Sequence, residues 1–112
     1  MSRVAETDVF MVLADPTRRR LIEVMHSGEH SVNELVSQVD IDQPGVSRHL
    51  RILHEAGFVK VRADGRRRLY SLRPEPLQVL AKWMRRYAHE EVQRVERLAS
   101  FVEDSPKKER PK

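Results

Sequence analysis

The sequence of 112 residues contains no cysteine, which excludes disulfide bonds, thiolate metal ligands and cysteine nucleophiles. Aromatic residues make up only 5% of the chain, which argues against an aromatic ligand cage. The longest apolar run covers residues 9–14, far short of the roughly 20 residues that a membrane-spanning helix needs. We therefore expect a soluble, cytoplasmic protein with a single folded domain.

Basic charge is concentrated in one part of the chain. Residues 42–73 contain eight Lys and Arg against three Asp and Glu, whereas the remaining residues contain 13 against 14. Such a segment is expected when one surface faces a polyanion, for example nucleic acid. A solvated charged surface would give the same numbers, so charge alone leaves both explanations open.

Capping signals predict four short helices. The first covers about residues 6–14, and Asp15-Pro16 caps and begins the second, which ends at Gly28. Ser31 and Glu34 form a capping box for the third. The predicted inward-facing residues of the second and third helices are Leu21, Ile22, Val24, Met25, Val32, Leu35, Val36 and Val39.

The fourth helix begins at Asp42, and its apolar stripe consists of Val46, Leu50, Leu53 and Gly57. Two strands follow, at residues 58–62 and 67–72, around an Asp64-Gly65 turn. A periodic apolar stretch over residues 77–102 then predicts one long helix. The rest of the chain is too small to cover its stripe, so we expect a second copy to cover it.

The domain is expected to cover residues 1–103. Residues 104–112 contain two prolines and no apolar residue, and we interpret them as a disordered tail.

Two helices followed by a basic hairpin give the layout of a winged helix-turn-helix, a mainly α fold with a small β-hairpin wing. The fourth helix would lie in the major groove of DNA. Its face opposite the apolar stripe carries side chains suited to bases and phosphates, namely Gln43, Ser47, Arg48, Arg51 and His54.

The hairpin tip carries three consecutive arginines, of which Arg66 is the candidate for reaching a minor groove. Strand alternation sends Arg66 and Arg68 to one face and Arg67 to the other. For Arg18, Arg19 and Arg20, a phosphate contact competes with ion pairs inside the chain.

Five segments resemble the ArsR/SmtB transcription regulators, over about residues 10–80. They are residues 13–21 (LADPTRRRL), 31–35 (SVNEL), 43–53 (QPGVSRHLRIL), 56–59 (AGFV) and 65–70 (GRRRLY). The resemblance implies a homodimer formed through the first and last helices. It also implies base or phosphate contacts at Gln43, Ser47 and Arg48, and a wing at residues 64–67.

From the residues and the resemblance together we predict three groups. The recognition-helix residues are Gln43, Gly45, Val46, Ser47, Arg48 and Arg51. The wing residues are Arg66, Arg67 and Arg68. The dimer interface comprises Phe10, Leu80, Met84, Ala88, Val92 and Val95.

The metal ligands of this family's sensors are not matched. Arsenic, cadmium and lead sensors carry a cysteine pair in the third helix, and this chain has no cysteine. Zinc and nickel sensors carry ligand pairs in the last helix, where this chain offers only His89 beside Glu90 and Glu91. The chain therefore resembles the Cys-free branch, whose members repress without a metal, often their own operon. No metal and no cofactor is predicted.

Catalysis is not expected. Ser47 and His49 are two residues apart on a helix, which separates their side chains by about 200° and prevents a triad with Asp42. The sequence has no nucleophile elbow and no glycine-rich phosphate loop.

The leading hypothesis is a homodimeric, sequence-specific DNA-binding repressor that binds a pseudo-palindromic operator. One alternative is a winged-helix protein-interaction module that uses the long helix as its partner site. Another is the same repressor gated by a metal, a small-molecule effector or a protein anti-repressor.

Overall fold

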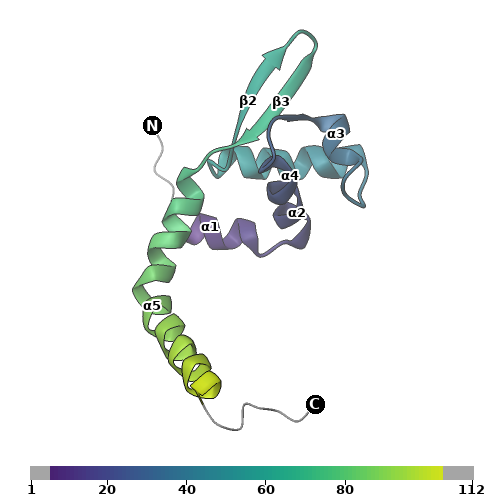
Figure 1. Cartoon of the computed structure of the whole chain (residues 1–112). Coiled ribbons are helices and arrows are strands. Elements are labelled where there is room, and N and C mark those ends of the chain that lie inside the picture. Colours follow the sequence, from purple (N-terminus) through teal and green to yellow (C-terminus); the bar gives the residue numbers. More distant parts are fainter. Residues whose placement is uncertain (1–5, 105–112) are drawn as a thin grey trace, which may run out of the picture. The chain divides into compact units, whose positions relative to one another are not determined.

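The computed structural model describes residues 6–104 (Figure 1), which belong to two compact units, residues 1–80 and 81–112. Each unit is described by itself. The elements in chain order are α1 (Glu6–Leu13), α2 (Pro16–Met25), β1 (His30–Ser31), α3 (Val32–Val36), α4 (Gln43–Glu55), β2 (Val59–Asp64), β3 (Arg67–Leu72) and α5 (Glu75–Asp104). The predicted mainly α class with a hairpin wing is confirmed.

The predicted N-terminal caps are present in the structure. The Asp15 carboxylate accepts hydrogen bonds from the backbone N–H groups of Thr17 and Arg18 at the start of α2. Ser31 and Glu34 form the capping box of α3. These contacts satisfy N–H groups that have no partner within the helix, so they fix where each helix begins.

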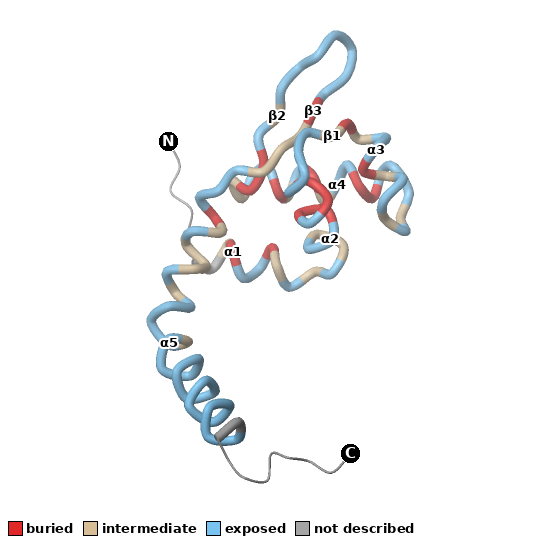
Figure 2. The backbone as a smooth tube through the Cα atoms, viewed as in Figure 1, coloured by how far each residue is buried: buried red, intermediate tan, exposed pale blue. Residues whose placement is uncertain are grey.

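The core of the first unit is formed by one face of each of its helices and by the base of the sheet. Figure 2 shows the buried positions of α2 and α4 in red. The fully or nearly fully buried apolar residues are Val9, Val12, Leu21, Ile22, Val24, Met25, Leu35, Val46, Leu50, Leu53, Phe58, Val59 and Leu69. The stripe predicted for the fourth helix is therefore the side that packs, and its opposite side is left to solvent.

The sheet has three antiparallel strands in the order β1-β3-β2. The sequence predicted the hairpin but not β1, because a strand of two residues carries no alternating pattern. His30 and Ser31 pair with Tyr70 and Leu69 on β3. This pairing attaches the hairpin to the segment that connects α2 with α3.

An ion pair gives the hairpin a second attachment. The Arg62 guanidinium donates two hydrogen bonds to the carboxylate of Glu29, from Nε to Oε2 at 2.9 Å and from Nη2 to Oε1 at 2.8 Å. The hydrogen bonds and charge of Arg62 hold the pKa of Glu29 below its ordinary value of 4.5. Two parallel hydrogen bonds fix the orientation of the guanidinium relative to the carboxylate as well as their distance. The pair therefore joins β2 to the segment before β1 in a defined geometry.

The described part of the second unit is the continuation of α5, which is longer than the predicted 77–102 helix at both ends. Seven of its large apolar side chains are more than two-fifths exposed, whereas Trp83 is half-buried; the seven are Met84, Tyr87, Val92, Val95, Leu98, Phe101 and Val102. Among residues 6–104, no helix combines the length and apolar character that crossing a bilayer requires. Asp104 ends α5, and the rest of the predicted tail, residues 105–112, lies outside the described residues. The predicted domain boundary at residue 103 stays a prediction.

Replacing the N-cap of α4 tests how that helix is held. Asp42 accepts the Gly45 N–H at 3.0 Å, so Asp42→Ala should lower the free energy of unfolding by about 1 kcal/mol. Asp42→Asn keeps an acceptor and should lose much less. Urea unfolding followed by circular dichroism measures both, and equal losses would show that the cap does not contribute.

The Glu29–Arg62 pair predicts a pH-dependent stability difference. Because the folded pKa of Glu29 is lowered, its stabilisation is present above about pH 4.5 and is lost as pH falls through the folded value. Glu29→Gln should therefore lower the melting temperature at pH 7 and lower it less at pH 3. Glu23→Gln, which removes a longer 3.5 Å pair with Arg20, is the control and should change little at either pH. A constant Glu29→Gln effect across this range would contradict the assignment.

Candidate nucleic-acid interface

The solvent face of α4 carries the polar side chains that the sequence placed there. Gln43, Ser47, Arg48, Arg51 and His54 are all exposed, while Val46, Leu50 and Leu53 are buried on the opposite side. One apolar stripe thus anchors the helix. The opposite face of the helix presents an amide, a hydroxyl, two guanidinium groups and an imidazole along one arc.

Two of the predicted recognition residues, Gly45 and Val46, do not belong to this arc. Val46 has no exposed surface, so its side chain cannot reach a nucleic acid. Gly45 is buried, and a Cβ atom there would lie 3.0 Å from Ile41 Cδ1 and 3.1 Å from Asp42 Oδ1. The role of these two residues in DNA binding stays a prediction, and the structure uses both positions for packing and for the tight start of α4.

A cleft of about 340 Å³ lies between α4 and the hairpin. Val61 and Tyr70 are cross-strand partners, and Arg68 lies two residues from Tyr70, so all three share one face of the hairpin. The residues that line the cleft are Ser47, Leu50, Arg51, His54, Val61, Arg68 and Tyr70. Two guanidinium groups, two hydroxyls and an imidazole around one hollow form a suitable site for a phosphate group.

The three arginines of the hairpin tip have different surroundings. Gly65 adopts a φ of +64°, which the tight turn requires, and Arg66 follows it as an exposed residue. Arg67 donates to the Asp64 carboxylate at 3.3 Å, within the hairpin. Arg68 faces the cleft beside α4. The structure thus brings Arg68, but not Arg67, into the lining that it shares with the α4 arc.

The arginines of α2 are largely occupied within the chain. Arg18 and Arg19 donate to backbone carbonyls at the end of α1, and Arg20 forms an ion pair with Glu23. The sequence left two explanations for these three arginines, a phosphate contact or ion pairs inside the chain. The structure shows contacts inside the chain for all three.

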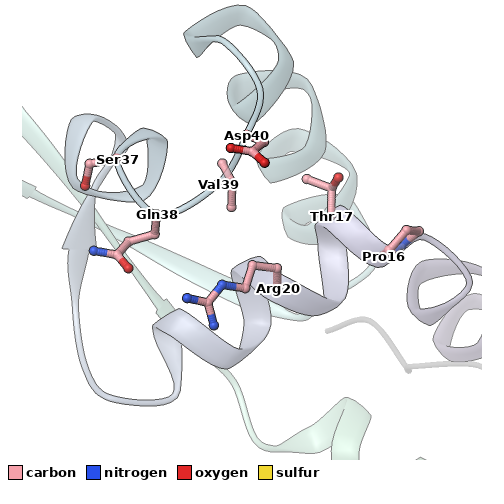
Figure 3. A pocket seen from close by; sticks show the side chains of 7 residues that line it. All are labelled: Pro16, Thr17, Arg20, Ser37, Gln38, Val39 and Asp40. Atoms are coloured by element: carbon pink, nitrogen blue, oxygen red, sulfur yellow. The ribbon is translucent and has the colours of Figure 1, made fainter.

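A second cleft, of about 370 Å³, lies between the start of α2 and the connection from α3 to α4 (Figure 3). Pro16, Thr17 and Arg20 line it from α2, opposite residues 37–40. It places the acid Asp40 and the base Arg20 in one lining, so it does not select a ligand of one charge.

The metal candidates do not assemble into a site. His89, Glu90 and Glu91 are exposed neighbours on α5. Within residues 6–104, no three His, Asp or Glu side chains lie close enough together to hold a metal ion.

The residues predicted for a dimer interface are located as follows. Phe10 is 41% exposed on α1, and Met84, Val92 and Val95 are 46–63% exposed on α5. Ala88 is half-buried. Leu80 is also half-buried, because it packs partly against the core of the first unit.

Comparison with known proteins identifies relatives over part of the chain. The family described as "Bacterial regulatory protein, arsR family" matches residues 15–61. The transcriptional repressor SdpR of Bacillus subtilis is 31% identical over 77 residues, which cover 69% of this chain and 86% of SdpR. A probable mercury resistance operon repressor of Streptomyces lividans is 43% identical over 63 residues, 56% of this chain and half of that protein.

A solved structure gives the same assignment. The crystal structure of a possible transcriptional regulator for arsenical resistance is 41% identical and superposes with a TM-score of 0.68, over 79% of this chain and 92% of that chain. The winged helix-turn-helix layout, the exposed α4 arc and these relatives agree. The chain belongs to the ArsR family and is a DNA-binding transcription regulator, not an enzyme.

Proposed function

We propose that this protein is a homodimeric repressor that binds a pseudo-palindromic operator, with α4 as its recognition helix. The observation that carries the proposal is the continuity of the exposed α4 arc with the cationic cleft beside the hairpin. Ser47 and Arg51 belong to both. A helix in the major groove needs base-reading groups and nearby phosphate contacts that fix its register, and these residues supply both.

The arc and the cleft have separate roles in this proposal. Gln43, Ser47 and Arg48, at the N-terminal half of α4, face base edges, where Arg pairs with guanine and Gln with adenine. Arg51 and Arg68 hold a backbone phosphate in the cleft. Arg66, exposed at the turn, enters the adjacent minor groove.

A second copy of the chain is proposed to cover the apolar side chains of α5. Exposed Val, Leu and Phe side chains over several turns form a larger apolar surface than a monomer usually leaves in water. The first unit contributes Phe10 on α1 to this proposed dimer interface. Two copies related by a twofold axis would place their recognition helices in successive major grooves, about 34 Å apart.

Repression follows the names of the relatives, two of which are called repressors. The absence of cysteine from the sequence excludes thiolate sensing as the signal for release. We therefore propose release by an effector of another kind, or by a protein anti-repressor.

Selection from random duplex DNA with the full chain tests the proposal. We expect an enriched pseudo-palindrome, and sedimentation of the complex should give two chains per duplex. Failure to enrich any sequence would contradict specific recognition, and a monomer on a single half-site would contradict the dimer.

Arg48→Ala tests the recognition helix. Removing a bidentate base contact should weaken binding to the selected duplex by about 1–3 kcal/mol and weaken binding to an unrelated duplex much less. Fluorescence anisotropy at fixed salt measures both. Arg94→Ala, which removes an exposed cation of α5, is the matched control and should leave both affinities close to wild type. Equal losses on both duplexes would make Arg48 a phosphate contact.

Arg68→Ala and Arg67→Ala test the cleft with neighbouring, identical side chains. Loss of one phosphate contact in each of the two chains of the dimer should make the slope of log affinity against log salt shallower by about 1.8. We expect this change for Arg68→Ala and a smaller one for Arg67→Ala, because Arg67 is engaged by Asp64. Equal slopes for wild type and Arg68→Ala would contradict a phosphate in the cleft.

A further inference from the structure

The side chain of Arg18, on α2, contacts both α1 and α4, two helices that are not adjacent along the chain. Its Nε donates to the carbonyl oxygen of Val12 at 3.0 Å, and its Nη2 donates to that of Met11 at 3.1 Å. These carbonyls belong to the last turn of α1, where the backbone N–H groups of Ala14 and Asp15 also donate to them, at 3.3 Å to Met11 and 3.5 Å to Val12. Its Nη1 lies 3.3 Å from Nδ1 of His49, in the middle of α4. The side chain is only 12% exposed, and its contacts with Val12 and His49 are partly buried, whereas the bond to Met11 lies at the surface.

The chemistry of the two side chains fixes the direction of the contact with His49. A guanidinium group has five N–H donors and no acceptor, so a hydrogen bond between the two side chains has Nδ1 of His49 as its acceptor, in the tautomer that carries the ring proton on Nε2. The carboxylate of Asp15 faces the same group, with Oδ2 4.0 Å from Nη1 of Arg18. Burial raises the pKa of Asp15, but backbone hydrogen bonds from Arg18 and Thr17, with the nearby His49 and Arg18 side chains, lower it further than burial raises it. The imidazole therefore has a cation and an anion as neighbours.

We propose that Arg18 and His49 are positioning residues that link the end of α1 to the recognition helix and contact no DNA themselves. His49 is half-buried between the exposed Arg48 and the buried Leu50, so a shift of its ring displaces the neighbouring arc. Phe10, a predicted dimer residue, immediately precedes Met11, whose carbonyl Arg18 holds. The inference rests on the proposed function of α4, and it adds a physical connection from the α1 surface to the DNA-reading surface.

The neighbouring arginine provides an internal comparison. Arg19 also holds the end of α1, through its Nη1 and the carbonyl oxygen of Leu13 at 2.6 Å. Its guanidinium donates to that carbonyl, and Arg18 is the member of this pair that bonds to α4. Variants at Arg19 therefore disturb the same helix end while leaving the link to α4 intact.

The first measurement needs no DNA, and its decisive part uses the wild-type protein. Nitrogen-15 NMR of the wild-type protein at neutral pH should show His49 Nδ1 as an unprotonated acceptor and Nε2 as protonated. In Arg18→Gln the Nδ1 resonance should shift, and in Arg19→Gln it should stay. A protonated Nδ1 in the wild-type protein would overturn the proposal whether or not the chain binds an operator.

The second measurement uses the selected duplex. His49→Leu and Arg18→Gln should each weaken specific binding about tenfold, within the range of coupling between sites in proteins, with an unchanged salt slope. His49→Asn retains an acceptor close to the Nδ1 position and should stay within about threefold of wild type, as should Arg19→Gln. The double variant His49→Leu with Arg18→Gln should lose little more than either single one, because both remove one interaction.

Three results would overturn the link. A shallower salt slope for His49→Leu would make His49 a phosphate contact, and additive losses in the double variant would mean that the two residues act separately. Equal losses for His49→Asn and His49→Leu would show that the acceptor is irrelevant. If the wild-type chain bound no duplex specifically, the proposed operator function would fail, while the NMR result would still decide the Arg18–His49 contact.

Discussion

The fold depends on burying one side of a single helix while leaving its other side free. Val46, Leu50 and Leu53 of α4 are fully or almost fully buried, and α2, α3 and the hairpin strand β2 pack around that helix. Apolar burial of this kind is the main favourable term in folding. Because the buried stripe fixes the rotation of α4 about its axis, it also determines which side chains face solvent. The functional surface is therefore a consequence of the core.

Much of this could be predicted from the sequence, because the signals are local. Caps at Asp15, Ser31 and Asp42 and the Asp64-Gly65 turn each act over three or four residues, and a periodic stripe reports one buried face. The polar arc of α4 could be predicted directly, because it lies opposite that stripe. Gly45 and Val46 lie outside this arc: both occur within the resembling motif, but the structure uses their positions for packing.

Other features depend on contacts between distant residues and carry no signal in one sequence. Strand β1 is only two residues long, Glu29 meets Arg62 across the sheet, and Arg18 meets His49 from 31 positions away. An arginine cluster gives no sign of which member bonds to a carbonyl and which is left in water. The cleft beside α4 likewise required the strand register that directs Arg68 toward the helix.

The exposed apolar side chains of α5 have a consequence for how such a regulator responds to its own abundance. If two chains must meet before a bipartite site is bound, the concentration of competent protein rises with the square of the free chain at low concentration. Occupancy then changes more steeply with synthesis than it would for a protein that binds alone. Affinity between the helices, set by side chains far from DNA, would determine the cellular level at which genes are switched.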